Sequence, residues 1–340
     1  MKKTVFNSWF LLTAVLIVTT AAAQDDHTDH KNEKEPKFKK TKSYTKSYSL
    51  GSNDKVSLSN QFGEMKISTW DKNEVKVDVS ITGKSDIETR AQQILDHISI
   101  EDGKSGNTVS FKTKFDDDKK TWNKENKEEH HNEGMEINYM VYLPASIALD
   151  ADNQFGKMIV PDFRGEAELS CKFGSLDAGK ISNAKEVNVE FGEANIDQVN
   201  GGKLSIKFSE GTINKLSGDV KTNFEFSQVK LNIGNDVKSL DVNNSYSTVY
   251  LDVDKNLSAA YDIRTSHGDF SNKTSFAINE EGGDNDHYGP KFDRKYKGTS
   301  GSGGAKLKVN SSFGEIIIGH DLKMEKGKNG KHRSPRQTVS

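Results

Sequence analysis

Between residues 153 and 253, the hydrophobic and polar positions follow a short pattern that recurs six times. In each copy an aromatic residue precedes glycine or serine, and alternating apolar and polar positions flank this corner on both sides. The aromatic residues lie 17 to 20 residues apart, and a near-constant period of this length is typical of a β-solenoid. They are Phe155, Phe173, Phe191, Phe208, Phe226 and Tyr246.

Two more copies of the pattern, at Phe62 and Phe313, lie outside this block. If all copies stack in register, equivalent positions are about 4.8 Å apart, so we expect the eight aromatic side chains to form a ladder inside the stack. The glycine after several of these aromatics predicts a corner with positive φ at the glycine. The fold class we predict is all-β, a single β-solenoid with rungs of roughly 18 residues.

The outward position just before the aromatic supports this register independently. It alternates in charge from copy to copy, so opposite charges would be neighbours between rungs, whereas a stack of like charges would repel. The residues at this position are Lys172, Glu190, Lys207 and Glu225.

A helix is predicted upstream of the main array. Ser85 and Glu88 have the spacing of a capping box, and five apolar residues then share one helical face. Two strands, near 98–101 and 108–114, follow it. We expect this helix and hairpin to cap the end of the stack, which would otherwise expose unpaired backbone and apolar side chains. The apolar face consists of Ile87, Ala91, Ile94, Leu95 and Ile98.

The predicted organisation begins with a secretory signal peptide over residues 1–24, which has a basic start, an apolar run and Ala21–Ala23 before the cleavage point. A charged, disordered leader is expected over 25–42, and the β-domain over 43–320. Within the domain, 115–134 and 279–304 are predicted as loops, and the final copy at 305–318 as the one that closes the stack. Residues 321–340 form a basic tail, flexible or weakly attracted to an anionic surface.

The composition narrows the classes of partner. The chain has 33% hydrophobic and 29% charged residues, and its 48 basic and 50 acidic residues leave a net charge of −2. This balance gives no field that would recruit nucleic acid. Cys171 is the single cysteine, so an intramolecular disulfide is excluded. Because Cys171 shares its column with Val189, Ile206 and Phe224, we expect a small buried hydrophobe rather than a reactive thiol.

Candidate chemistry in the sequence is sparse. Three groups of residues raise a metal hypothesis, but solvated loops explain them because nothing fixes a ligand geometry. His267 stands in the aromatic column and is expected to be a core histidine with a local hydrogen bond. Three glutamates on outer faces raise the hypothesis of glycan cleavage, but each recurs with the repeat. We therefore predict no catalytic, cofactor or metal site. The metal candidates are His27 with His30, His130 with His131, and Asp284 with Asp286; the glutamates are Glu190, Glu193 and Glu210.

Residues 50–319 resemble a bacterial family of exported candidate adhesins, the head-GIN-like group of β-solenoid domains. The resemblance rests on the corner at Phe62–Gly63, a helix-containing excursion, the segment 141–144, the recurring Phe-Gly corners and the closing copy at 309–318. It implies surface adhesion and brings no catalytic residues. The end of the predicted signal resembles those of Bacteroidetes-type bacteria, which implies the periplasm or the outer surface.

The expected function is thus a non-enzymatic, exported binding or structural module of the bacterial cell envelope. Its partner would be an envelope or surface ligand, either a glycan or a protein. The chain itself is expected to have no transmembrane segment after signal cleavage and no cofactor. The alternatives are a carbohydrate-active β-helix enzyme and a purely structural envelope protein. The enzyme would need acids and bases that do not recur with the repeat, clustered in a groove on one face.

Overall fold

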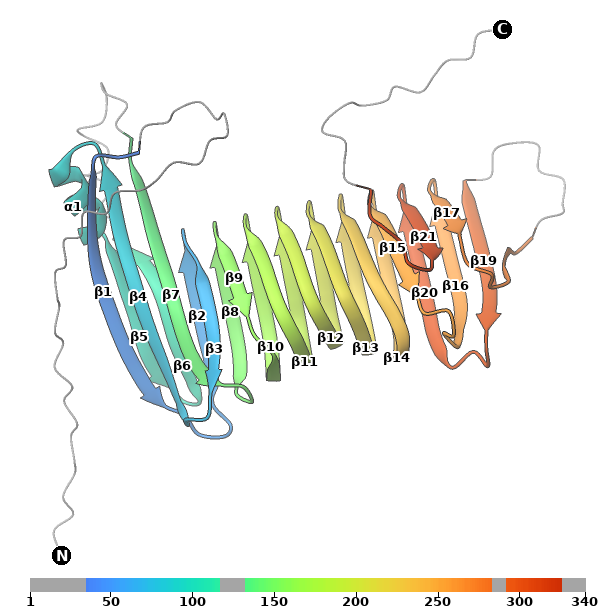
Figure 1. The fold of residues 1–340 in the computed structure, drawn as a ribbon, viewed down its shortest axis with the longest axis horizontal. Helices are drawn as coiled ribbons and strands as arrows, with labels where there is room; N and C mark the ends of the chain where they lie inside the picture. Colours follow the sequence, from blue (N-terminus) through green and yellow to red (C-terminus); the bar gives the residue numbers. More distant parts are fainter. Residues whose placement is uncertain (1–34, 117–131, 283–291, 326–340) are drawn as a thin grey trace, which may run out of the picture.

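The computed structural model describes residues 35–116, 132–282 and 292–325, and in these ranges the protein is all-β with one short helix. All strands of the described ranges belong to one open, hydrogen-bonded sheet, which folds into a long stack (Figure 1). The strands are β1 (Phe38–Ser49), β2 (Lys55–Gln61), β3 (Met65–Trp70), β4 (Glu74–Ser85), β5 (Ile98–Ser105), β6 (Thr108–Phe115), β7 (Gly134–Pro144), β8 (Ala148–Gln154), β9 (Lys157–Val160), β10 (Phe163–Lys172), β11 (Ser175–Glu190), β12 (Glu193–Lys207), β13 (Glu210–Glu225), β14 (Gln228–Ser245), β15 (Thr248–Val253), β16 (Ala259–Ser266), β17 (Asp269–Asn272), β18 (Ile278–Glu280), β19 (Asp293–Ser300), β20 (Ala305–Ser312) and β21 (Glu315–Gly319), and the helix is α1 (Glu88–Asp96).

The middle of the stack is built from rungs that pair in parallel. A rung consists of the strand segment before an aromatic corner and the segment after it, and both segments pair with the equivalent segments of the next rung. Lys172 pairs with Glu190, Glu190 with Lys207, and Lys207 with Glu225, which confirms the predicted register. Ion pairs join Lys172 to Glu190 (3.4 Å) and Lys207 to Glu225 (3.0 Å).

The core lies between the two layers of segments and follows the alternation of the sequence. Before the corner at residue 191, Val187 and Val189 are fully buried, and after it Ala194 and Ile196 are. Cys171 has no exposed surface and pairs in register with Val189, so the prediction of a buried cysteine is confirmed. Each rung therefore buries a thin apolar strip, and stacking makes these strips continuous.

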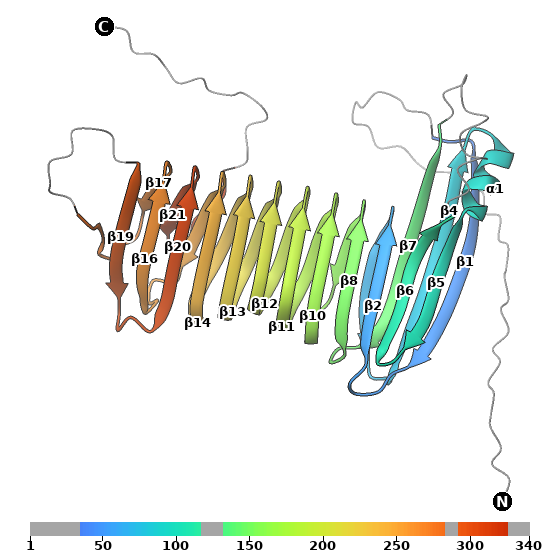
Figure 2. The ribbon, with the colours of Figure 1, turned by 180° about the vertical axis from the view of Figure 1, so that it is seen from behind.

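At the N-terminal end the first copy lies directly beside the second. β2 pairs in parallel with β8, so that Gln61 faces Gln154, and β3 pairs with β9. The intervening chain extends the stack outward: β7, β4 and β1 continue one layer, and β6 and β5 continue the other (Figure 2). β1 begins at Phe38, so the last residues of the predicted leader form a strand.

Helix α1 packs on β4 at the N-terminal end of the stack (Figure 1). A Cβ atom at Gly83 would lie 2.4 Å from the carbonyl oxygen of Ala91, so the helix backbone approaches the strand at that glycine. The predicted capping box is wrong, because Ser85 is still in β4 and the N-cap is Ile87, which has no side-chain cap. Ile87 is 40% exposed, whereas the other four residues of the predicted apolar face are buried.

At the C-terminal end the order of rungs in space differs from their order in the sequence. β20 lies between β14 and β16, and β21 lies between β15 and β17, so the copy at Phe313 is inserted before the copy at His267. The expectation that residues 305–318 close the stack is wrong. The predicted loop 279–304 contains β19, which pairs antiparallel with β16, and β18 pairs antiparallel with β19.

Several predictions fall outside the described residues. These are the signal peptide over 1–24, most of the leader, the centre of loop 115–134 and the tail after residue 325. The metal candidates His27, His30, His130, His131, Asp284 and Asp286 also lie there.

Candidate functional site

The aromatic residues that were expected inside the stack lie on its outer surface. The seven ladder residues from Phe155 to Phe313 are 45% to 53% exposed. Phe62 is half-buried, and its ring meets Phe115 edge-on with centroids 5.9 Å apart. The prediction of an internal ladder is therefore wrong about the side of the sheet on which the rings lie.

Backbone conformation explains this reversal. Strict alternation from Val187 and Val189 would direct Phe191 inward, but every aromatic at a corner has a positive φ, from 49° to 64°. This left-handed conformation interrupts the alternation at the corner, so the side chain leaves the core. The glycine that follows does not carry the positive φ, and the prediction for that position is also wrong.

The exposed rings stack face to face in one column along an edge of the stack, starting at Phe62. From Phe62 to Phe313, neighbouring ring centroids are 4.7 to 5.1 Å apart and the ring planes are within 8° of parallel. The column continues through His267, 4.9 Å from Phe313, to Phe292, 4.6 Å from His267. His267 is exposed, so the prediction of a core histidine is wrong; its Nδ1 lies 3.3 Å from the Ser266 hydroxyl.

This column, which we call the aromatic ladder, offsets the strain of its own corners. A left-handed conformation costs a non-glycine residue about 1–2 kcal/mol, and an aromatic pair contributes about 0.5–1.5 kcal/mol beyond its buried area. Each interior ring has two partners. The corner N–H groups are also satisfied, since the Phe191 N–H donates to the Lys207 carbonyl (3.0 Å) and the Phe208 N–H to the Glu225 carbonyl (2.8 Å).

The residue after each aromatic sits where two rungs approach closely. A Cβ atom at Gly192 would lie 1.8 Å from the Gly174 carbonyl oxygen, and one at Gly174 would lie 1.9 Å from that of Gly156. Serine replaces glycine in the next rungs and uses its hydroxyl: Ser209 Oγ accepts from the Gly192 N–H (3.0 Å), and Ser227 Oγ from the Ser209 N–H (3.2 Å). Space thus requires glycine at residues 174 and 192, whereas at residues 209 and 227 a serine fits at this corner and provides a hydrogen bond along the stack.

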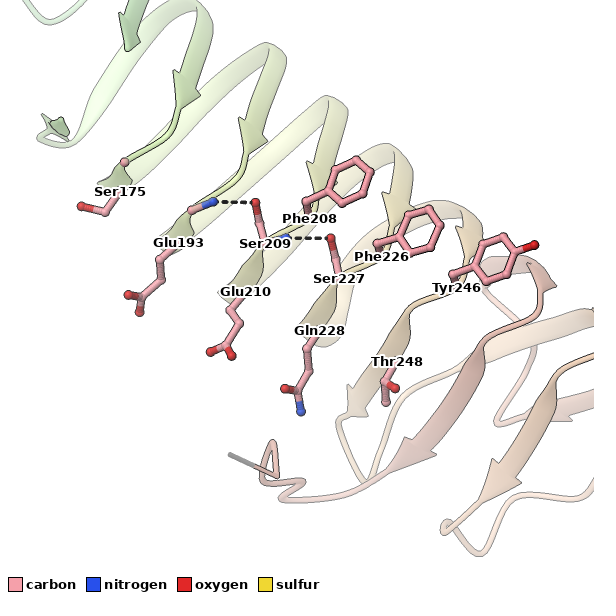
Figure 3. A pocket seen from close by; sticks show the side chains of 12 residues that line it. Ser175, Glu193, Phe208, Ser209, Glu210, Phe226, Ser227, Gln228, Tyr246 and Thr248 are labelled. Atoms are coloured by element: carbon pink, nitrogen blue, oxygen red, sulfur yellow. Dashed lines mark hydrogen bonds between the residues drawn. The ribbon is translucent and has the colours of Figure 1, made fainter. Parts of the chain in front are cut away.

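A shallow groove of about 760 Å³ runs beside the ladder. Its inner margin includes the rings of Phe208, Phe226 and Tyr246, and its other side is a row of polar side chains from the start of each following strand (Figure 3). Glu193, Glu210 and Gln228 pair in register in this row. The row is Ser175, Glu193, Glu210, Gln228 and Thr248.

The three glutamates of the enzyme hypothesis do not form one cluster. Glu190 precedes the corner and forms an ion pair with Lys172, whereas Glu193 and Glu210 follow their corners and line the groove. Glu193 accepts a hydrogen bond from the Asn195 amide (3.0 Å). The ladder lies between Glu190 and the other two glutamates. The three carboxylates therefore do not converge on one point, as the acid and base of an enzyme would.

A polar cluster at the N-terminal end of the stack was not predicted from the sequence pattern. Tyr44 and Tyr48 of β1 both donate hydrogen bonds to the Asp102 carboxylate of β5, each at 2.5 Å. Burial, with the Asp102 hydrogen bond and charge as further causes, raises the pKa of Tyr48 to about 12 and that of Tyr44 still further. The two tyrosines lie on one face of a strand, but only the fold brings Asp102 to them.

Metal-binding clusters and membrane-spanning helices are both absent from the described ranges. No group of three or more His, Cys, Asp or Glu side chains there could bind a metal ion. In the same ranges, no helix has the length and apolar character needed to cross a membrane.

Comparison with known proteins gives weak similarities only. No family model matches the chain, and no curated protein matches it. Among solved structures, it is similar to a candidate cell-adhesion protein from Clostridium sporogenes (16% identity, 83% of this chain and 100% of that one, TM-score 0.25) and a candidate adhesin from Bacteroides fragilis (11%, 81% and 96%, TM-score 0.37). A candidate lipid-binding protein from Parabacteroides distasonis is also similar (13%, 81% and 96%, TM-score 0.28). At these identities and TM-scores, none of them supports an inference about this chain, and the head-GIN-like family stays a prediction.

Proposed function

We propose that this protein is an exported β-solenoid that acts as a non-enzymatic binding module of the bacterial cell envelope. The solenoid architecture, with rungs of about 18 residues, is supported by the parallel register that joins equivalent positions of successive rungs. Export to the periplasm, the outer surface or the medium rests on the predicted signal peptide over residues 1–24.

The exposed aromatic ladder is the observation that carries the binding function. Soluble proteins rarely expose large contiguous apolar patches, and such patches mark interaction surfaces. Here the rings from Phe155 to Phe313 are each about half exposed and form one uninterrupted stripe. Polar and charged columns border this stripe on both sides, as at the rim of a protein interface.

Ring orientation favours a protein partner over a glycan. Each interior ring has both faces covered by its neighbours at about 4.9 Å, so only the ring edges reach a ligand. A sugar that stacks on an aromatic needs a free ring face, and the interior of the ladder has none. A polypeptide can contact the edges with apolar side chains and the flanking columns with polar ones.

Binding screens with the chain from Asp25 onward test this proposal. The chain would be presented to glycans and to envelope proteins, with and without calcium. The matched variant is Phe173→Gly/Phe191→Gly/Phe208→Gly, because glycine tolerates the corner conformation. Lys185→Ala/Lys203→Ala, which removes exposed ion pairs away from the ladder, is the control.

We expect a protein ligand whose binding the triple variant abolishes and the control preserves, with both variants folded. Failure of the chain to bind any glycan or envelope protein would contradict the proposal. If deletion of the protein altered envelope integrity without changing adhesion, the purely structural alternative would be favoured.

A further inference from the structure

The chain that follows β21 turns back across the outside of the stack. His320 Nδ1 lies 2.7 Å from the Val253 carbonyl oxygen, and Asp321 forms an ion pair with Lys255 (3.2 Å). The Lys230 ammonium then donates to the Leu322 carbonyl (2.7 Å). These contacts hold residues 320–325, which we call the C-terminal strap, against the outer layer (Figure 1).

The strap covers an outward-facing side chain of the stack. Tyr250 occupies an outward position in β15, yet it is only 6% exposed. The Glu325 N–H lies 3.4 Å from the Tyr250 hydroxyl. The strap is therefore packed on the stack and has a defined direction.

That direction leads into the groove beside the aromatic ladder. The strap starts at β21, crosses β15 and reaches β14, where Gln228 Nε2 donates to the Glu325 carbonyl (2.8 Å). Gln228 belongs to the polar row of the groove, and the next two residues of that row are Glu210 and Glu193 (Figure 3). The last described residue of the chain thus lies one rung from Glu210.

The chain beyond this point has the complementary charge. Residues 326–340, which lie outside the described residues, contain Lys326, Lys328, Lys331, Arg333 and Arg336 and no Asp or Glu. In the part of the chain that the structure describes, the Glu210 carboxylate has no ion pair or hydrogen bond.

The spacing of these charges also fits. Neighbouring rungs are about 4.8 Å apart, and an extended chain advances about 3.3 Å per residue with alternate side chains on one side. Side chains two residues apart in an extended chain are therefore about 6.6 Å apart on the same side, so two lysines with this spacing can reach carboxylates on neighbouring rungs. The ring edges of Phe208 and Phe226 offer an apolar surface for the lysine methylene groups.

We propose that the basic segment 326–336 of this chain binds in the groove beside the aromatic ladder, with Lys326 and Lys328 paired to Glu210 and Glu193. The groove is then a site for an extended basic peptide whose resident occupant is the protein's own tail. An external partner that uses the same side of the ladder has to displace it. This inference does not depend on what the ladder binds.

Zero-length cross-linking tests the proposal directly. A carbodiimide joins a lysine to a carboxylate only where the two are in contact, and the products in the monomer fraction are mapped by mass spectrometry. We expect Lys326 or Lys328 to be joined to Glu210 or Glu193 at least fivefold more than to Glu315. Glu315 is the matched control, because it pairs in register with Thr248 at the far end of the polar row. The preference should fall in 1 M NaCl, since exposed pairs are screened.

A second measurement uses the variant Glu193→Gln/Glu210→Gln and a chain that ends at Glu325. In hydrogen exchange, both should lose protection over residues 191–197 and 206–212 relative to the full chain, by the same amount. Cross-links spread evenly over surface carboxylates, or unchanged exchange after truncation, would overturn the proposal. Cross-links found only in dimers would also overturn it, and would indicate a second copy as the occupant.

Discussion

The ring of Tyr246 stacks on the ring of Phe313 with centroids 5.0 Å apart and planes 4° from parallel, although residues 247–312 lie between them in the chain. The backbones of these two rungs are also hydrogen-bonded to each other, because the Tyr246 N–H donates to the Ser312 carbonyl (3.0 Å). The copy at His267 follows Tyr246 in sequence but lies one rung further out. The ladder is thus completed by tertiary structure, and its continuity can be tested one ring at a time.

Replacing a ring in the middle of the ladder should reveal the balance between stacking and backbone strain. Phe191→Ala removes two stacked pairs and keeps the strained corner, so we expect a loss of about 1–3 kcal/mol in the free energy of unfolding. Phe191→Gly loses the same pairs but relieves the left-handed strain, and should be roughly 0.5–1 kcal/mol more stable than the alanine variant. Urea unfolding measures both. An alanine variant as stable as the glycine variant would show that the corner is not strained.

Gly192, which follows the Phe191 ring, should tolerate no side chain. In Gly192→Ala the new Cβ would be 1.8 Å from the Gly174 carbonyl oxygen, so the rungs would have to separate. We expect a destabilisation of about 3 kcal/mol or more, visible as a lower Tm or loss of soluble protein. The control is Ser209→Ala at the equivalent corner, which loses the bond from the Gly192 N–H and should cost only about 1 kcal/mol. Equal effects of the two substitutions would argue against the close approach.

Alkaline pH should weaken the N-terminal end of the stack. The pKa of Tyr48 is raised to about 12 chiefly by burial, so the folded state keeps its phenolic proton where the unfolded chain loses it. Its contribution to stability is therefore complete below about pH 10 and is lost as the pH rises toward 12. We expect urea midpoints to fall over this range. In Tyr44→Phe/Tyr48→Phe the protein should be less stable at pH 8 and its midpoint should fall less steeply above pH 10; an unchanged slope would contradict this assignment.

The thiol of Cys171 should be inert in the folded protein. Burial raises its pKa to about 11, and the side chain has no exposed surface, so both thiolate formation and access are prevented. A disulfide reagent at pH 8 should leave the native protein unmodified and should modify one thiol per chain in urea. Cys171→Val, which matches its neighbour Val189 in the same column, should keep the Tm within a few degrees. Rapid modification of the native protein would show that the rung opens locally.

The repeat and its register could be predicted because they depend on local periodicity. The alternation around Val187 and Val189 identified the buried side of each strand, and the signs of Lys172 and Glu190 predicted which residues meet between rungs. The cysteine was placed in the core by the same alternation. These features follow from which side chains avoid water and which charges attract.

The candidate site was only partly predictable. The eight ladder residues were identified as a set, but continuing the alternation through the corner directed them inward. The sequence does not reveal that the aromatic itself, rather than the glycine after it, adopts the positive φ. The polar row that includes Glu210 and Gln228 was visible only as scattered residues, and nothing in the pattern indicated that the chain end returns to it.

The sequence by itself thus determined the strands of the repeat, their buried faces and the alignment of neighbouring rungs, because local periodicity and side-chain polarity decide these properties. The tertiary structure alone decided that the aromatic ladder faces outward, that the Phe313 rung lies before the His267 rung, and that the strap ends beside Glu210. These three properties depend on contacts between distant segments and on a corner conformation stabilised by stacking between rungs, and both exist only once the rungs are assembled.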